Sequence, residues 1–146
     1  MLVNSETFAM VIKSAIVIES EIEEIFSAVF ANPKHLFDLK LNYEHKIALV
    51  LSLGLDDRFK PPLGNLATLR NKFAHRLDVG FGMDEAKNFY STFDAIDQSH
   101  MKYEYANFGG KPFEELPPED LFIICIVTLR AAILAASQRL KAKPVT

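Results

Sequence analysis

The residues best suited to chemistry lie in one short segment, Arg70-Asn71-Lys72-Phe73-Ala74-His75, in which four residues separate the arginine from the histidine. Histidine titrates near neutral pH and the planar fork of arginine binds anions, so the pair combines a proton-transfer group with an anion-binding group. On an ideal helix Asn71 and His75 share a face, whereas His75 lies about 140° around the axis from Arg70. A common site therefore requires the long arginine side chain to bend, or a second copy of the helix to supply one group. The alternative interpretation is that His75 is an exposed structural histidine.

Arg70 is unexpected at its place in the helix. Spacings of three and four residues predict that the inward stripe consists of Leu66, Leu69, Phe73 and Leu77. At about 100° per residue, Arg70 falls close to the centre of that stripe. Because an unpaired guanidinium is costly to bury, we expect Arg70 to meet a carboxylate or carbonyl groups, or to face a cleft or a partner subunit.

The rest of the chain predicts an all-α fold, a single bundle of about five helices over residues 1–146. The expected helices run from Phe8 to Val29, about Tyr43 to Leu53, Pro61 to about Leu77, Met83 to near His100, and Pro117-Pro118 through Ala136, before a frayed tail at 141–146. Asn4 or Ser5 is the expected N-cap of the first helix, and Asn32-Pro33 its end. Whether residues 35–41 join the second helix stays open.

Composition and charge narrow the function classes. The chain has 146 residues, 49% of them hydrophobic, and a formal net charge of -3, so we expect one sizeable core and no broad basic surface for duplex DNA. The sequence contains no helix-turn-helix with a basic second helix, so direct reading of DNA bases is not expected. Lys13 and Glu19 interrupt the N-terminal apolar stretch, which argues against a secretory signal. The apolar stretch from Leu121 to Ala136 falls short of the roughly 20 residues of a membrane span, so we expect a soluble cytoplasmic protein without a membrane partner.

Other chemically capable residues give weaker signals. The only cysteine, Cys125, lies in an apolar run and is expected to be buried. The histidines lack the spacing of a helical zinc site and the glycine pairs lack a phosphate-loop motif, so neither a metal nor a cofactor is expected. Asp94 and Asp97 predict a solvated acidic patch. The aromatic loop 103–108 is expected to pin the long connection before Leu116 to the bundle, or to line a groove or cover a partner surface.

The segment Leu69-Arg-Asn-Lys-Phe-Ala-His75 resembles the Arg-Asn-x-Phe-Ala-His signature of HEPN-like helical domains and of the related mannitol operon repressor family. The stretch from Lys46 to Leu55, which ends in Leu-Gly-Leu and precedes the arginine helix, is similar to the repressor family in its order. The resemblance covers residues 43–78 and implies an all-helical bundle that is usually a homodimer.

In ribonuclease members of the HEPN group, the Arg-x4–6-His pattern forms a metal-independent RNA-cleaving site at a dimer interface. Carried over to this chain, the resemblance implies that His75 is the general acid or base at the 2′-hydroxyl or the leaving oxygen. It implies that Arg70 holds the scissile phosphate and that Asn71 orients one of the two groups. Lys72 and Arg76 flank the segment and could attract phosphate.

Two functional hypotheses follow. The first is a HEPN-like, dimeric module that is regulatory or targets RNA, with Arg70, Asn71 and His75 as its site and metal-independent RNA cleavage as its activity. The second is a regulator similar to the mannitol operon repressor, which acts through a regulatory protein partner without catalysis. The enzyme requires Arg70 and His75 to be accessible and close to their dimer mates. The interaction module tolerates Arg70 buried against a carboxylate and His75 on an ordinary surface.

Overall fold

The fold is all-α, as a computed structural model of residues 5–75 and 80–142 shows. In chain order the elements are α1 (Ser5–Val29), α2 (Pro33–Asp38), α3 (Tyr43–Leu53), the 3₁₀ turn η1 (Asp57–Phe59), α4 (Lys60–His75), α5 (Met83–Ser91), α6 (Ala95–Glu104), the two-residue strands β1 (Asn107–Phe108) and β2 (Lys111–Pro112), the 3₁₀ turn η2 (Phe113–Glu115) and α7 (Pro118–Ala142). The helical class is confirmed. The expected number of about five helices is wrong, because the described residues form seven α-helices.

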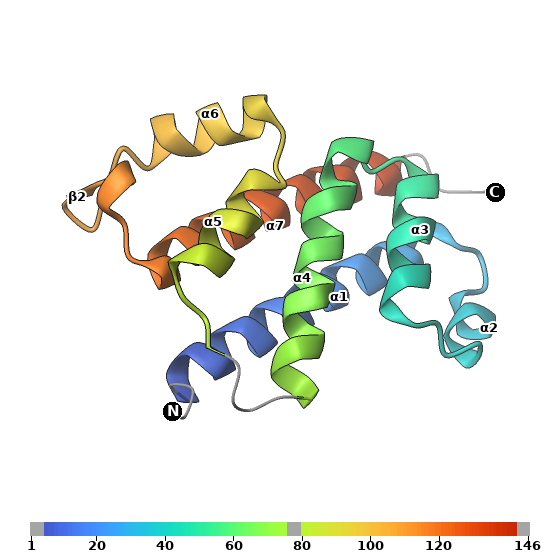
Figure 1. Cartoon of the computed structure of the whole chain (residues 1–146). Coiled ribbons are helices and arrows are strands. Elements are labelled where there is room, and N and C mark those ends of the chain that lie inside the picture. Colours follow the sequence, from blue (N-terminus) through green and yellow to red (C-terminus); the bar gives the residue numbers. More distant parts are fainter. Residues whose placement is uncertain (1–4, 76–79, 143–146) are drawn as a thin grey trace.

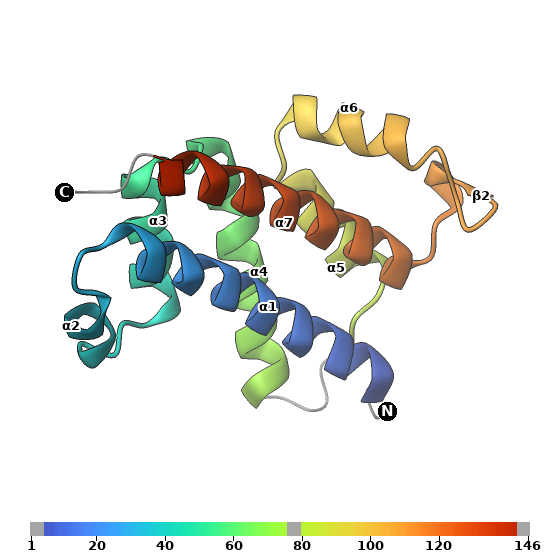
Figure 2. The same ribbon diagram turned by 180° about the vertical axis from the view of Figure 1, so that it is seen from behind.

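The two longest helices, α1 and α7, form one layer of the fold. They run side by side in the same direction, with α4 and α5 packed against them from the other side (Figures 1 and 2). α3 contacts both α1 and α4, and α6 lies against α7. The buried core draws on all of these helices, with Ile18, Ile22, Leu66, Phe89 and Leu129 fully enclosed. Burial of this stripe of each helix, at roughly 25 cal/mol per Å² of apolar surface, is the main driving force for the arrangement.

The N-terminal third differs from the expectation at its proline. α1 ends at Val29, and Pro33 begins the short helix α2 rather than only ending the first one. Proline is accepted there because the first N–H groups of a helix have no intrahelical acceptor. Residues 35–41 therefore do not extend α3, which keeps its expected bounds and is capped by the side chain of Asn42 on the N–H of His45. The alternative N-cap Asn4 lies outside the described residues.

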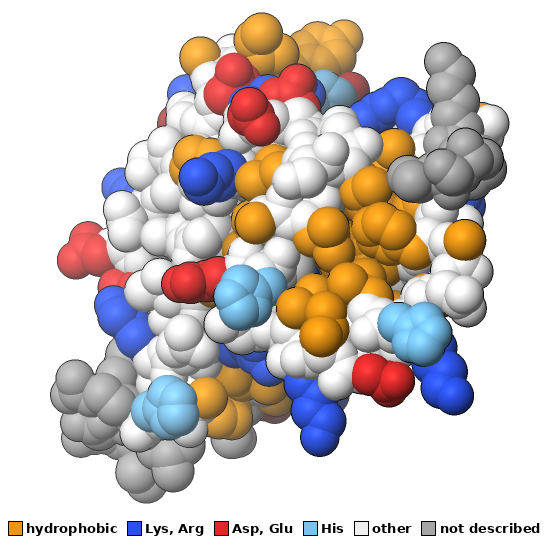
Figure 3. Space-filling view, turned by 90° about the vertical axis from the view of Figure 1, so that its right-hand side faces the viewer, with side chains coloured by type: hydrophobic (Ala, Val, Ile, Leu, Met, Phe, Trp, Pro, Cys, Tyr) orange, Lys and Arg blue, Asp and Glu red, His pale blue; other side chains and the backbone are white. Residues whose placement is uncertain are grey.

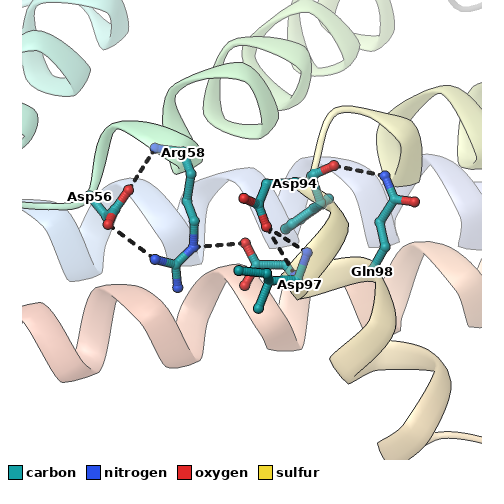
Figure 4. Close-up of polar contacts among 7 residues, drawn as sticks. Asp56, Arg58, Asp94, Asp97 and Gln98 are labelled. Atoms are coloured by element: carbon teal, nitrogen blue, oxygen red, sulfur yellow. Dashed lines mark hydrogen bonds and ion pairs between the residues drawn. The ribbon is translucent and has the colours of Figure 1, made fainter.

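The expected helix from Met83 to near His100 is wrong as a single element, because it is broken into α5 and α6. The break is caused by Asp94, whose side chain accepts hydrogen bonds from the N–H groups of Ile96 and Asp97 and so caps a new helix (Figure 4). Such a cap contributes about 1 kcal/mol. Gln98 reinforces the corner by donating to the carbonyl of Phe93.

The interpretation of Asp94 and Asp97 as a solvated patch is also wrong. Asp97 is buried, and its Oδ2 lies 3.0 Å from Nε of Arg58 on η1. Nη1 of Arg58 lies 3.1 Å from Oδ2 of Asp56, so one guanidinium joins two carboxylates (Figure 4). The hydrogen bond to Asp97 raises the pKa of Arg58, more than burial lowers it. This network fastens α6 to the start of α4.

Replacing Asp97 with asparagine is expected to lower the free energy of unfolding by about 1–2 kcal/mol. The substitution keeps the shape but removes the charge that faces Arg58 in a buried position. Urea unfolding measures the change, with Asp57→Asn, at an exposed position on the same side, as the matched control expected to stay within about 0.5 kcal/mol of wild type. Equal losses in the two variants would refute the structural role of Asp97.

The connection between α6 and α7 is a small hairpin held by aromatic rings. Gly109 and Gly110 have positive φ values of 61° and 81°, which glycine adopts without steric cost, and they form the turn between β1 and β2. The ring of Phe113 is buried against Tyr90 at a centroid distance of 5.6 Å. Tyr103 points outward, with 83% of its surface exposed. The expectation that rings pin this connection to the bundle is thus confirmed at Phe113 and not at Tyr103.

α7 is longer than the apolar stretch that predicted it, with 25 residues from Pro118 to Ala142. By length and composition it is the one helix in the described ranges that could cross a membrane, with a mean hydropathy of 2.0 over its most apolar window. In this fold α7 packs on α1 and α5 and buries Phe122, Leu129 and Ile133. Cys125 is buried on the same helix as expected, and burial raises the pKa of its thiol. The residues 141 and 142 belong to the helix, and the rest of the expected tail lies outside the described residues.

Candidate functional site

The candidate site lies on the C-terminal half of α4, which is anchored by its buried stripe. Leu66, Leu69 and Phe73 are buried as expected, while Leu77 lies outside the described residues. The ring of Phe73 contacts the ring of Phe8 on α1 at a centroid distance of 5.9 Å and that of Phe81 before α5 at 6.3 Å. These contacts fix the rotation of α4 and therefore the direction of every side chain between residues 70 and 75.

Arg70 lies at the edge of the buried stripe and not at its centre, which corrects the expectation. Its side chain remains 34% exposed, and its Nη2 lies 3.7 Å from Oε1 of Glu19 on α1. The guanidinium carbon also lies 5.9 Å from the ring centroid of Tyr43. Arg70 thus meets a carboxylate and faces solvent, so both expected solutions to its burial are realised in part.

Glu19 is held more tightly by Lys46 than by Arg70. Nζ of Lys46 lies 2.9 Å from Oε2 of Glu19 and 2.8 Å from Oε1 of Glu23, both within hydrogen-bond range. Burial lowers the pKa of Lys46, but the hydrogen bonds to Glu23 and Glu19 outweigh it and raise that pKa. The contact of Arg70 with Glu19 is longer than a hydrogen bond, so the guanidinium keeps donors for another acceptor.

Arg70 and Asn71 face a common hollow of about 530 Å³ between α1, α3 and α4. Its lining consists of Glu19, Leu41, Asn42, Tyr43, Glu44, Ala67, Arg70 and Asn71. The N-terminus of α3 borders the hollow, and the N–H groups at a helix start favour anions. Two carboxylates, Glu19 and Glu44, oppose the one guanidinium of Arg70 among the ionisable lining groups. This balance suits a phosphodiester, with its single negative charge, better than a doubly charged phosphate monoester.

Tyr43 lies at the wall of this hollow with a hydroxyl that has no hydrogen-bond partner in the described structure. Burial raises the pKa of Tyr43, and the nearby charge of Glu19 raises it further. A buried hydroxyl without a partner is a cost to the folded state.

Replacing Tyr43 with phenylalanine is therefore expected to leave the free energy of unfolding unchanged or to raise it by up to about 1 kcal/mol. The ring that supports Arg70 is retained and only the unpartnered hydroxyl is removed. Chemical denaturation measures the change, and a loss above about 1 kcal/mol would show that the hydroxyl has a stabilising partner. Tyr105→Phe, on a half-buried ring beyond α6, is the matched control.

The structure does not bring His75 into the hollow. His75 is exposed at the end of α4, and it is not among the residues that line the space beside Arg70. Lys72 points to a different hollow, of about 500 Å³, with Asp84 and Glu85 of α5. Within one chain, Arg70 and Asn71 are thus together and His75 is apart, as ideal helix geometry predicts. Arg76, the other expected flanking cation, lies outside the described residues.

A second hollow was not predicted from the sequence. It is an apolar groove of about 560 Å³ between α3 and α4, and its walls are Glu44, Ile47, Ala48, Leu51, Lys60, Pro61 and Gly64. Figure 3 shows the side of the molecule that carries α2 and α3, where hydrophobic side chains gather at the centre of the surface and histidines lie near them. The signal for it was present in the small residues Ala48 and Gly64, whose lack of bulk on exposed helix faces opens the groove.

The chain is similar to none of the known family models, curated proteins or solved structures with which it was compared. Its function is therefore argued from its residues and their geometry. The site defined by Arg70 and Asn71 is an accessible, singly cationic hollow at a helix start, with an exposed imidazole one turn further along α4.

Proposed function

We propose that this protein is a HEPN-like, cytoplasmic helical module that targets RNA as a homodimer through Arg70, Asn71 and His75. One observation carries the proposal. The guanidinium of Arg70 is one-third exposed over an open hollow, and its nearest carboxylate is 3.7 Å away and already hydrogen-bonded to Lys46. An arginine with a purely structural role would instead have its donors satisfied by close carboxylate contacts.

Each group has a role that its position supports. Arg70 binds a phosphodiester of the RNA strand, together with the N–H groups at the start of α3. Asn71 lines the same hollow and hydrogen-bonds the phosphate or the adjacent sugar. His75 transfers a proton at the 2′-hydroxyl or at the leaving oxygen, which its exposure permits. The bent side chain of Arg70 or His75 of a second copy completes the set.

The charge distribution makes the RNA contact local. The chain has a formal net charge of -3, and Glu19 and Glu44 face the hollow itself. Only a strand that places one phosphate against Arg70 gains from the site, because further phosphates meet no continuous basic surface. We therefore expect modest affinity and specificity for flexible, single-stranded RNA.

The proposal is tested by incubating a mixed RNA pool with the protein in EDTA, beside Arg70→Ala and His75→Ala purified identically. Cleavage by wild type that disappears in both variants, with helical content unchanged in circular dichroism, supports a metal-independent ribonuclease. Intact RNA after incubation with a dimeric wild type moves the conclusion to the non-catalytic alternative.

That alternative is a regulator, similar to the mannitol operon repressor, that works by protein contacts. The apolar groove between α3 and α4 favours it, because its walls at Ile47, Ala48 and Leu51 offer an apolar surface for a partner segment. In this case Glu19 and Tyr43 hold Arg70 as part of the scaffold, and His75 is an ordinary surface residue.

A further inference from the structure

The outer faces of α1 and α7 are apolar although no described element covers them. Large hydrophobic side chains that remain exposed in the described chain are Ile16, Val17, Phe37, Leu39, Ile96, Tyr103, Ile123, Val127 and Leu134. Five of these nine lie on α1 and α7, which are neighbours in one layer. Figure 2 views this layer from outside, with α4 and α5 behind it. The exposed apolar side chains are therefore concentrated on one face.

The stripe along α7 has opposite charges at its two ends. At about 100° per residue, Asp120, Ile123, Val127, Leu134 and Lys141 fall within about 60° of one another on the helix surface. Asp120 is half-buried in the first turn and Lys141 is exposed in the last turn, with the three apolar side chains between them. The stripe is thus acidic at its start, apolar in its middle and basic at its end.

The stripe along α1 has the same property with the signs reversed. Lys13 and Glu24 are both exposed and lie within about 20° of each other around the helix, three turns apart. Ile16 and Val17, exposed by 51% and 42%, lie between them. Each helix therefore presents a face whose two ends attract each other when it is paired with a reversed copy of itself.

We propose that this face binds the same face of a second copy of the chain, with α7 antiparallel to α7 and α1 antiparallel to α1. A two-fold axis that crosses α7 between Arg130 and Ala131 places Asp120 opposite Lys141 of the second copy. The same operation places Val127 opposite Leu134 of the second copy, so apolar groups meet at the centre and opposite charges at both ends. Such an isologous contact is the commonest form of homodimer.

The face has the size that a stable dimer needs. α1 and α7 have 25 residues each, or about 37 Å at 1.5 Å per residue, and two packed helices present a strip about 20 Å wide. The resulting area of about 700 Å² is close to the roughly 800 Å² per partner of a standard specific interface. No other exposed apolar group among the described residues spans two full-length helices.

This dimer would place the two candidate sites on one side of the assembly. Because α1 faces its own copy across the axis, the edge of α1 that carries Glu19 lies next to the equivalent edge of the second copy. The two Arg70 hollows then open on the same edge, where one RNA strand can reach both. The interface itself rests on the surface of α1 and α7 and holds whether or not RNA is the ligand.

Sedimentation equilibrium of the full chain tests the proposal. Wild type is expected to show twice the 16.5 kDa monomer mass, and Val127→Asp is expected to weaken association by at least 100-fold. Ile96→Asp, at an exposed isoleucine on α6, is the matched control and should remain dimeric. Circular dichroism verifies that both variants fold.

A charge exchange tests the antiparallel register. Asp120→Lys alone and Lys141→Asp alone are each expected to raise the dimer dissociation constant about 10-fold, and the double variant to return it to within about threefold of wild type. A wild type that stays at 16.5 kDa at every concentration, a double variant without recovery, or equal effects of Val127→Asp and Ile96→Asp would overturn the proposal. RNA cleavage by Val127→Asp is measured in parallel, so a monomer that cleaves RNA refutes this interface and leaves the proposed function standing.

Discussion

Replacing His75 with alanine is expected to slow RNA cleavage in EDTA by about 10²–10⁴-fold, the usual contribution of a positioned proton-transfer group. Arg70→Ala is expected to slow it by about 10²–10³-fold, because charge on the phosphate then grows without the guanidinium. Initial rates with a fluorescent single-stranded RNA measure both effects. Neither residue contributes a fully buried side chain to the core, so both variants should keep the wild-type unfolding midpoint within a few degrees.

Two matched variants make this result specific to the site. Arg70→Lys keeps the charge but loses the planar fork, so an intermediate rate is expected. Lys72→Ala removes an exposed cation that points to a different hollow and should change the rate by less than about threefold. If Lys72→Ala slowed cleavage as much as Arg70→Ala, general attraction of RNA to α4 would explain the activity and a defined site would not.

Replacing Phe73 with alanine is expected to lower the free energy of unfolding by about 3–5 kcal/mol. Phe73 is fully buried, and its ring joins α4 to Phe8 on α1 and to Phe81 before α5. Removal of the ring leaves a cavity at the point where three parts of the chain meet, so the loss should be large. Thermal and urea unfolding, followed by circular dichroism, give the change.

The comparison for this variant is Leu39→Ala. Leu39 is 69% exposed after α2, and its truncation should cost less than about 0.5 kcal/mol. A small loss at Phe73 would contradict the packing of α4 described above. It would also remove the reason for the fixed direction of Arg70 and Asn71.

Local periodicity predicted the elements whose patterns are self-contained. The bounds of α3 follow from Asn42 at one end and Gly54 at the other, where the chain adopts a φ of 126° that favours glycine. The stripe of Leu66, Leu69 and Phe73 was predicted because spacings of three and four require only the helix itself. The burial of Cys125 was equally local, since its neighbours along the chain are all apolar.

Long-range partners could not be predicted in the same way. That Arg70 needs a carboxylate follows from its position, but nothing in the local sequence selects Glu19, 51 positions earlier, from the other acidic residues. The break at Asp94 was missed because the apolar spacing continues across it, from Phe89 to Phe93 and Ile96. The cap of Asp94 and the ion pair between Asp97 and Arg58 together override that spacing.

The separation of His75 from the hollow also has a geometric cause. Five steps along an α-helix turn the direction of a side chain by about 140°, so Arg70 and His75 diverge on any straight helix. A resemblance in sequence order cannot show whether a bent arginine or a second copy restores their meeting. The dimer inferred from α1 and α7 supplies a second copy on the same edge, which makes the question open to measurement.

The most direct test of the central claim is an NMR titration of the ¹⁵N-labelled protein with a short single-stranded RNA in EDTA. The proposed function predicts shift changes centred on the side chains of Arg70 and Asn71 and on the ring of His75, at RNA concentrations where Lys60 and Lys111 do not move. Unchanged signals at Arg70 and His75 at saturating RNA, or changes confined to other basic residues, would contradict it.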